Sequence, residues 1–311
     1  MTKPSVLVLG SSNTDLIVKV ARIPRPGETI LGGEFATAGG GKGANQAVAA
    51  ARAGGAVTFV ARVGRDANGD RAVEGFAAAG IDVKYVIRDP THPSGVALIF
   101  VGRGGENSIA VASGANDRLS PTDVRKARPA FQRAWVVLLQ LETPLKTIAA
   151  SLELATSAGL RIVLNPAPAR PLPGRLLERV YLLTPNESEA ELLTGVAVAS
   201  ERAAARAADA LLDRGVHNVA ITMGSRGVFV AGPGVRQMIP GFKVKAIDAT
   251  GAGDVFNGAL VVALAEGRPL LEAARFGCAA AAISVTRLGA QPSAPTRRAI
   301  NALLAEGKVR A

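Results

Sequence analysis

An aspartate, Asp254, directly follows a short glycine-rich turn and opens a strongly apolar segment. Residues 248–254 read DATGAGD, and VFNGALVVALAEG follows. Glycines allow a tight turn, and the N–H groups at a helix start, together with the helix dipole, form an anion site. A carboxylate beside such a site can take the proton of an attacking hydroxyl while the N–H groups hold phosphoryl charge. The same pattern is also typical of an ordinary helix N-terminus with a capping carboxylate.

A second glycine-rich segment, residues 39–45 (GGGKGAN), precedes an Ala-rich run. It is not a Walker A loop, because Lys42 is followed by Gly43 where Ser or Thr is required. It is not a dinucleotide fingerprint either, because Gln46 stands where the third glycine belongs. Two interpretations stay open: a flexible hinge before a helix, or a wall on which Lys42 and Asn45 bind a polyhydroxylated ligand.

A third polar segment, residues 10–15 (GSSNTD), follows the first apolar run of the chain. Ligands of open α/β sheets bind outside the carboxyl ends of strands. Asn13 and Asp15 carry short polar side chains suited to sugar hydroxyls. In isolation the segment is more typical of an ordinary Asx turn.

The composition of the 311 residues excludes several classes of protein. One cysteine, Cys278, rules out an internal disulfide framework and a multi-cysteine zinc site. With only two histidines, His92 and His217, a general base is expected to be a carboxylate. Apolar residues make up 48% and charged residues 20%, which is typical of a globular protein.

The charge balance raises the alternative of a nucleic-acid-binding protein. Lys and Arg total 36 against 25 for Asp and Glu, a formal net charge of +11. Such a protein is expected to cluster its basic residues with aromatic ones, whereas the longest basic run here is Arg297-Arg298. No apolar run reaches the ~18 residues of a membrane span, and the first residues do not resemble a signal peptide. We therefore expect a cytoplasmic protein with no nucleic-acid or membrane partner.

Short apolar runs alternate along the chain with amphipathic segments, and this rhythm predicts strands and helices in alternation. Strands are expected at residues 6–9, 57–63, 135–139, 161–164, 181–184 and 219–223. Helices are expected at residues 43–53, 66–79, 144–158, 187–193, 201–214, 254–266, 270–286 and 295–305. Continuous Val, Leu and Ile in the strands predict an α/β fold with a parallel sheet covered on both faces.

Two stretches do not fit that alternation. Residues 29–38 (TILGGEFATA) and 95–112 (GVALIFVGRGGENSIAVA) alternate in hydrophobicity without a helix, and the second contains a hairpin signal at Gly104-Gly105. We expect them to form a small separate sheet that serves as a lid or a dimer surface. No composition shift divides the chain, so a single domain is expected.

Read together, these segments resemble the ribokinase branch of the PfkB carbohydrate kinase family. The resemblance runs through nearly the whole chain and includes PRPGET (24–29), GVALIFV (95–101), QLETP (140–144), NPAPAR (165–170), TPNESEAELLTG (184–195), GSRGV (224–228), FNGAL (256–260) and VTRLGAQPS (285–293). It implies a three-layer, parallel-sheet kinase domain over residues 1–311. It also implies a small β-sheet lid, inserted at about residues 12–39 and 93–115, that mediates a homodimer.

The resemblance implies a role for each matching residue. Asp254 is implied as the base that deprotonates a sugar 5-hydroxyl, and Gly251, Ala252 and Gly253 as the anion hole. The implied sugar-binding residues are Asn13, Asp15, Gly41, Lys42, Asn45, Glu142 and Asp254. Because ribose is the leading acceptor, the implied reaction is ATP-dependent formation of ribose 5-phosphate. Deoxyribose, another pentose, a ketohexose such as fructose and a nucleoside such as adenosine remain alternatives.

The cofactors are implied in the same way. ATP is expected to contact Asn186, Glu189, Thr222, Gly224, Ser225, Gly227, Gly253 and Cys278, and Asn186 with Glu189 to position phosphate and Mg²⁺. A monovalent cation, K⁺, is expected near Asp248, Thr250, Ser284, Arg287, Gly289 and Ser293. Cys278 departs from the Asn or His usual in relatives; it is also compatible with a small buried hydrophobe.

Overall fold

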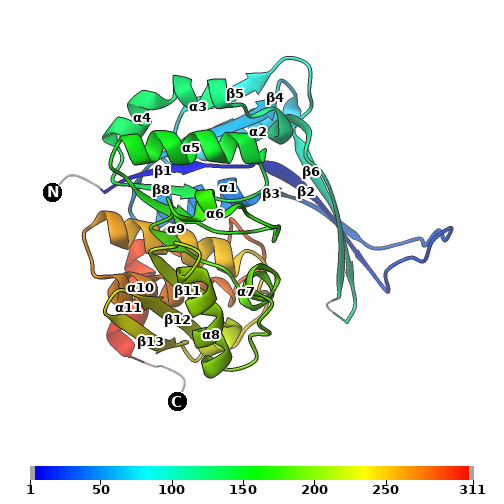
Figure 1. Cartoon of the computed structure of the whole chain (residues 1–311). Coiled ribbons are helices and arrows are strands. Elements are labelled where there is room, and N and C mark those ends of the chain that lie inside the picture. The colour runs from blue at the N-terminus through cyan, green and yellow to red at the C-terminus, as the bar shows by residue number, and fades with distance from the viewer. Residues whose placement is uncertain (1–3, 105, 308–311) are drawn as a thin grey trace.

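A nine-stranded sheet forms the centre of the molecule in the computed structural model, which describes residues 4–104 and 106–307 (Figure 1). The strand order is β13-β12-β11-β10-β9-β8-β1-β4-β5. The strands are β1 (Ser5–Leu9), β4 (Ala56–Gly64), β5 (Asp82–Asp89), β8 (Val136–Leu139), β9 (Arg161–Leu164), β10 (Leu182–Leu183), β11 (Asn218–Thr222), β12 (Gly227–Gly232) and β13 (Val235–Pro240).

The pairing in this sheet is parallel from β5 to β11 and antiparallel beyond it. β11 pairs with β12, and β12 with β13, in antiparallel register. β12 and β13 are separated by only two residues, and a connection that short can join only antiparallel strands. The expectation of a parallel sheet therefore holds for most of the sheet, while sequence analysis missed β5, β12 and β13.

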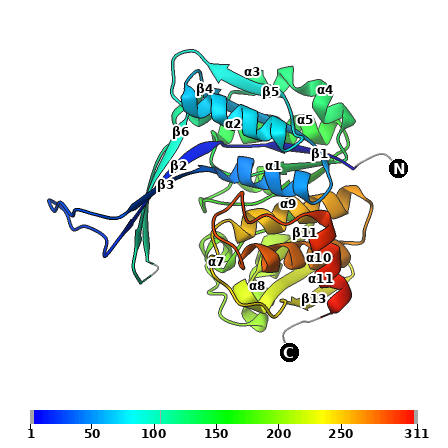
Figure 2. The ribbon, with the colours of Figure 1, turned by 180° about the vertical axis from the view of Figure 1, so that it is seen from behind.

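Helices cover both faces of the large sheet, which makes three layers (Figures 1 and 2). One face packs against α1 (Lys42–Arg52), α2 (Ala67–Ala78), α9 (Ala252–Ala265), α10 (Leu270–Ser284) and α11 (Arg297–Glu306). The other packs against α3 (Pro121–Lys126), α4 (Arg128–Arg133), α5 (Leu145–Ser157), α6 (Gly174–Leu177), α7 (Glu187–Thr194) and α8 (Glu201–Leu212).

Side chains of the central strands alternate between two hydrophobic cores, one on each face of the sheet. In β1, Val6 and Val8 belong to the core under α1 and α9, whereas Leu7 and Leu9 belong to the core on the opposite face. Successive side chains of a strand point to opposite faces, so a strand buried on both faces needs apolar residues at every position. This explains why these strands read as unbroken apolar runs in the sequence.

A second, four-stranded sheet projects from one side of the body as an arm (Figures 1 and 2). Its order is β3-β2-β6-β7, with β2 (Asn13–Val20), β3 (Glu34–Gly40), β6 (Gly95–Gly102) and β7 (Asn107–Ala112). The small separate sheet expected from the sequence is thus confirmed. Gly105, part of the expected hairpin turn, lies outside the described residues.

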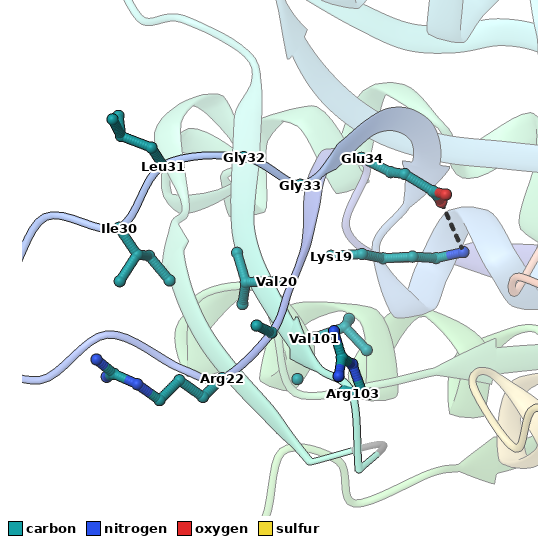
Figure 3. Close-up of a pocket in the computed structure, with 12 residues that line it drawn as sticks. Lys19, Val20, Arg22, Ile30, Leu31, Gly32, Gly33, Glu34, Val101 and Arg103 are labelled. Carbon is teal, nitrogen blue, oxygen red and sulfur yellow. Dashed lines mark ion pairs between the residues drawn. The ribbon is translucent and has the colours of Figure 1, made fainter.

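The projecting sheet is apolar on both of its faces. Leu98 (50% exposed) and Phe35 (67%) lie on one face, and Ile109 (54%) and Val111 (52%) lie on the other. Near the tip, a groove of about 930 Å³ lies between the end of β2, the start of β3 and the end of β6. Figure 3 shows Lys19 and Glu34 pointing toward each other at this groove, where they form an ion pair of 3.5 Å.

No helix within residues 4–104 and 106–307 is long and apolar enough to cross a membrane.

Candidate active site

The glycine-rich segment and the Asp254 segment meet because α1 and α9 lie side by side and begin at the same edge of the sheet (Figure 2). Two side chains from the first turn of α1 reach the carboxylate of Asp254. Asn45 donates Nδ2 to Asp254 Oδ2 over 2.9 Å, and Gln46 donates Nε2 to Asp254 Oδ1 over 2.9 Å. Asp254 is 7% exposed, so its carboxylate is buried with a donor on each oxygen.

The start of α1 also packs tightly against the start of β2. Gly41 precedes the helix with φ 86°, a conformation that favours glycine. A Cβ at this position would lie 2.8 Å from the backbone nitrogen of Asn13. The absence of a side chain therefore brings Asn13, Lys42 and Asn45 into one site.

Asp254 experiences opposing electrostatic effects. Burial raises the pKa of its carboxyl group, while the ammonium of Lys42 and the hydrogen bonds from Asn45 and Gln46 act to lower it. Burial raises the pKa of this carboxyl group, and the donors on its two oxygens orient it. These are the properties required of a general base.

Polar side chains surround the space next to Asp254. Burial, Glu142 and Asp254 raise the pKa of Asp15 to about 6. Glu142 Oε2 accepts hydrogen bonds from Ser11 Oγ (2.6 Å) and from the backbone N–H of Lys42 (2.9 Å). Asn45 Oδ1 is buried and has no hydrogen-bond partner among the described residues. An unpartnered buried acceptor beside carboxylates suits a ligand that carries several hydroxyl groups.

Lys42 lies among the carboxylates of Asp254, Glu142 and Glu189. Burial acts to lower the pKa of its ammonium, but Asp254, Glu142 and Glu189 raise it further, and the net shift is upward. The ammonium therefore stays charged and faces carboxylates from three separate segments. In this place it can hold a sugar hydroxyl, as expected from the sequence, and can also neutralise phosphoryl charge.

The turn before Asp254 adopts a left-handed conformation. Gly251 has φ 72° and is the N-cap residue of α9. A Cβ added at Gly253 would have no heavy atom within 4 Å, so this residue borders open space. The N–H of Ala252 donates to Ala249 O over 3.2 Å.

A cavity of about 570 Å³ lies on the other side of this turn. Seven residues expected to contact the nucleotide line it: Asn186, Thr222, Gly224, Ser225, Gly227, Gly253 and Cys278. Its apolar walls were not expected from the sequence and include Phe242, Val244, Ala246, Phe256, Ala281, Ala282 and Val285. These residues carry no polar group that could have marked them.

Cys278 lies in α10 with its thiol against this cavity. It is 8% exposed, and burial raises the pKa of the thiol to about 12 despite the opposing charge of Arg275. The thiol is therefore neutral at physiological pH, and it serves as a small apolar part of the wall.

Asn186 and Glu189 form a reciprocal capping box at the start of α7. The backbone N–H of Asn186 donates to Glu189 Oε2 (2.9 Å), and Glu189 N–H donates to Asn186 Oδ1 (2.8 Å). Asn186 lines the cavity, whereas Glu189 is not among its lining residues. Burial raises the pKa of Glu189, which the Asn186 hydrogen bond and the Lys42 charge partly oppose.

The residues expected around a monovalent cation come from two loops that lie together. Asp248 accepts hydrogen bonds from Thr250 N–H on Oδ1 (2.9 Å) and from Gly289 N–H on Oδ2 (2.8 Å). Burial works to raise the pKa of Asp248, but these hydrogen bonds outweigh it and lower the pKa. The hydroxyls of Ser284 and Ser293 donate to the carbonyls of Ala281 and Ala290 (both 2.8 Å), and Arg287 N–H donates to Ser284 O (3.0 Å).

Several buried polar residues next to the site were missed by sequence analysis. Gln46 attracted attention only as the residue in place of a third glycine, and Asn165 only as part of a longer motif. The missed residues are Gln46, Asn116, Gln140, Asn165, Thr184 and Asn257, all within 7% exposure. Their types are ordinary, and only the fold places them together.

A buried carboxylate among polar side chains, a glycine turn at the start of a helix and a cavity on the other side of that turn are features expected of an enzyme of the sugar kinase class. The chain belongs to the pfkB family of carbohydrate kinases, whose family model matches residues 3–297. The resemblance noted in the sequence is thereby confirmed.

Individual relatives match over nearly their full length. A ribokinase from Haemophilus influenzae is 47% identical over 296 residues, which cover 95% of this chain and 97% of the relative. A deoxyribokinase from Salmonella typhi is 36% identical, covering 96% of this chain and 98% of the relative. A ribokinase from Arabidopsis thaliana, solved in complex with ribose and ATP, superposes with a TM-score of 0.89 at 34% identity, covering 97% of this chain and 99% of that one.

Proposed function

We propose that this sugar kinase transfers the terminal phosphoryl group of ATP to the 5-hydroxyl of D-ribose and forms ribose 5-phosphate. The observation that carries the proposal is the position of Asp254. Its carboxylate contacts Asn45 on the sugar side, and its neighbour Gly253 lines the nucleotide cavity. The similarity to ribokinases over nearly the whole chain supports ribose as the acceptor.

The reaction follows from this arrangement. Asp254 takes the proton of the 5-hydroxyl as its oxygen forms a bond to the γ-phosphorus of ATP, and the bond from that phosphorus to the leaving oxygen of ADP breaks. Gly251, Ala252 and Gly253 present N–H groups to the transferring phosphoryl group. The ammonium of Lys42 compensates its negative charge.

The sugar is held by the polar side chains around Asp254. Asn13 and Asp15 at the start of β2, Asn45 in α1 and Glu142 after β8 provide hydrogen-bonding groups for the ring hydroxyls. Gly41 contributes to the sugar site by letting the start of α1 approach the backbone of Asn13 closely. A site built to bind a hydroxyl rejects an analogue that lacks it, because its buried polar groups are then left unpaired. We therefore place ribose ahead of 2-deoxyribose, which the deoxyribokinase relative makes the main alternative; fructose and adenosine are the others.

Mg²⁺ and K⁺ are part of the proposal. Mg²⁺ is usually held by substrate phosphates and waters with few protein carboxylates. Within residues 4–104 and 106–307 no cluster of three or more His, Cys, Asp or Glu side chains could hold a metal, which agrees with such a mode. Asn186 and Glu189 would orient it. The carbonyl and hydroxyl oxygens near Asp248, Thr250, Ser284, Arg287, Gly289 and Ser293 are suitable donors for K⁺.

The remaining parts of the proposal concern the molecule as a whole. We place the enzyme in the cytoplasm, where ATP is available, and take residues 1–311 as one kinase domain with a lid. We also propose a homodimer in which the projecting sheets of two copies cover each other. The exposed apolar residues on both faces of this sheet support that arrangement.

A coupled assay of ADP release across ribose, 2-deoxyribose, fructose and adenosine, each with and without K⁺, tests the proposal. We expect the highest kcat/KM with ribose, and a higher kcat in K⁺ than in a choline salt of equal ionic strength. A clear preference for another acceptor would overturn ribose as the substrate while leaving the sugar kinase class intact.

A further inference from the structure

The buried amide of Gln46 links the catalytic aspartate to the interior of the protein. Its Nε2 donates to Asp254 Oδ1 (2.9 Å) and also to Asn165 Oδ1 (3.0 Å). Its Oε1 accepts a hydrogen bond from Gln140 Nε2 (2.5 Å). An amide nitrogen carries two hydrogens, so both donors are used, and Gln140 on the other atom fixes which way the amide points. Gln46 is 0% exposed.

The hydrogen bonds continue from Asn165 back to the anion-binding turn. Asn165 Nδ2 donates to the carbonyl oxygen of Thr184 (2.9 Å), and the Thr184 hydroxyl donates to Asn257 Oδ1 (2.6 Å). Asn257 Nδ2 then donates to the carbonyl oxygen of Gly253 (2.8 Å). This series of hydrogen bonds thus starts at Asp254 and ends at Gly253, the second residue of α9. It runs from α1 to α9 through Asn165 and Thr184, which follow β9 and β10.

Charged groups from four elements surround the base at the other end. Lys42 of α1 favours the ionised form of Asp254, while Glu142 opposes it. Asp15 of β2 and Glu189 of α7 also interact with the Asp254 charge. In this setting the two amide donors, Asn45 and Gln46, are the neutral groups that hold the carboxylate oxygens. A hydrogen bond donated to a carboxylate favours its ionised form.

We propose that Gln46 is a positioning residue for phosphoryl transfer: it holds the Asp254 carboxylate ionised and oriented, and ties it through Asn165, Thr184 and Asn257 to the turn at Gly253. The inference rests on the proposed function. Gln46 differs from Asn45, whose free Oδ1 is available to a ligand, because every polar atom of the Gln46 side chain is bound within the protein. Gln46 therefore acts through Asp254 and not by touching the substrate.

The variant Gln46→Leu separates this role from a merely structural one. Because the donor to Asp254 is lost, the acidic limb of the kcat–pH profile is expected to move up by about one pH unit. We expect kcat at neutral pH to fall about ten- to a hundredfold, since small misplacement of a reacting group has effects of this size. The KM for ATP is expected to stay the same, because Gln46 does not line the nucleotide cavity.

Asn218→Leu is the matched control. Asn218 is a buried amide (5% exposed) that donates to Tyr181 O (3.0 Å), outside the network. Its loss is expected to lower the melting temperature and to leave the position of the acidic limb unchanged. If both variants lose activity in proportion to stability and neither moves the limb, the proposal is wrong.

Two further variants keep the test decisive if Gln46→Leu does not fold. Gln46→Glu conserves shape and the acceptor for Gln140 but replaces a donor by a second carboxylate next to Asp254, so the acidic limb should move further upward. Gln140→Met frees the amide of Gln46 to rotate, and a smaller upward shift is expected. An unchanged limb in both folded variants contradicts the inference. Wild-type enzyme inactive on every sugar would instead contradict the proposed function.

Discussion

The carboxylate of Asp254 is buried. The role proposed for it, that of a general base, requires it to be ionised and then to accept a proton from a sugar hydroxyl. Burial raises the pKa of the carboxyl group, and Lys42, Asn45 and Gln46 act against this rise. Burial makes the carboxylate more basic than an exposed one, which favours acceptance of an alcohol proton, while the Lys42 charge and the two hydrogen bonds favour its ionised form. Lys42 is central to this balance because its charge acts on the base without using either carboxylate oxygen.

Replacing Asp254 with Asn tests this balance directly. We expect kcat to fall by at least about 10²–10⁴-fold, the usual contribution of a general base, while the sugar still binds in calorimetry. Removing the buried charge favours the folded state, while the amide nitrogen of Asn cannot accept one of the two hydrogen bonds that the carboxylate accepts, so we expect only a small change in melting temperature. Asp209→Asn, which removes an exposed carboxylate of α8 paired with Arg236, is the control. Near-normal turnover in Asp254→Asn would exclude this residue as the base.

The ionised carboxylate of Asp15 lowers the free energy of unfolding, because the group is buried near other carboxylates. Burial and the neighbouring Glu142 raise its pKa to about 6 from 3.8, so the folded state binds the proton more tightly than the unfolded chain. The ionised group therefore destabilises the fold above about pH 6, and this effect fades as the pH falls toward 4. Asp15→Asn is expected to raise the melting temperature more at about pH 7.5 than at about pH 5.

The same substitution should weaken sugar binding, because the amide nitrogen replaces an acceptor of a sugar hydroxyl. We expect KM for the sugar to rise about ten- to a hundredfold and KM for ATP to stay the same, in steady-state assays at both pH values. In the wild type, KM for the sugar should rise as the pH falls through about 6. A Tm gain that is equal at both pH values would show that the pKa of Asp15 is not raised.

The sequence identified residues whose type and local motif are distinctive, and it missed those defined by remote partners. Asp254, Lys42 and Asn45 stand next to glycines that mark a turn. Gln46 and Asn165 are ordinary amides, and they meet only because α1 and β9 are brought together, 119 positions apart in the chain. A contact of that kind cannot be predicted from spacing along one sequence.

At the scale of elements, the backbone N–H groups where a left-handed turn joins the start of α9 form the phosphoryl site that we propose. Gly251 has φ 72°, and a Cβ there would lie 2.7 Å from Ala290 Cβ. Gly253, two residues further on, faces open space. The two glycines thus differ: the first permits the turn, and the second borders the open space in which we propose that the phosphoryl group binds.

Alanine substitutions distinguish these two roles. Gly253→Ala should not lower the melting temperature, since alanine favours a helix over glycine, but should reduce kcat about tenfold or more because the methyl group enters the phosphoryl site. Gly251→Ala should destabilise the protein by about 1 kcal/mol or more, because the turn requires a positive φ. Denaturant unfolding and steady-state kinetics measure both. A Gly253→Ala enzyme with normal kcat would place the phosphoryl group elsewhere.

Most strands with a continuous apolar pattern were predicted, with β12 (GVFVAG) as the exception, whereas both edge strands of the large sheet were missed. β1, β8 and β9 are buried on both faces and read as unbroken runs of Val, Leu and Ile. β5 (DVKYVIRD) and β13 (VRQMIP) lie at the two edges of the sheet, and polar side chains interrupt the apolar pattern of each. Their hydrophobic signal is weaker because an edge strand has less surface to bury.

At the scale of the whole molecule, the projecting sheet exposes apolar side chains that no other described part of the same chain covers. Its strands are β3, β2, β6 and β7, and apolar side chains remain exposed on both faces. The register places Leu98 beside Leu16. At the next position on the same face, Val18 lies between Phe35 and Phe100. A sheet of this kind in water is expected to find a partner surface. We propose that a second copy offers the same apolar face and that a two-fold dimer covers the face of each copy that carries Leu98 and Phe35.

The variant Leu98→Glu tests whether this face forms the dimer. A charge at the centre of an apolar interface is costly to desolvate, so we expect the variant to elute as a monomer in size-exclusion chromatography with light scattering, while the wild type is a dimer. The lid begins at Asn13 and Asp15, next to the sugar, so KM for the sugar should rise severalfold while KM for ATP stays the same. Trp135→Glu, which alters an exposed residue (68%) next to the start of β8, should remain a dimer. A dimeric Leu98→Glu protein would show that the copies associate through another surface.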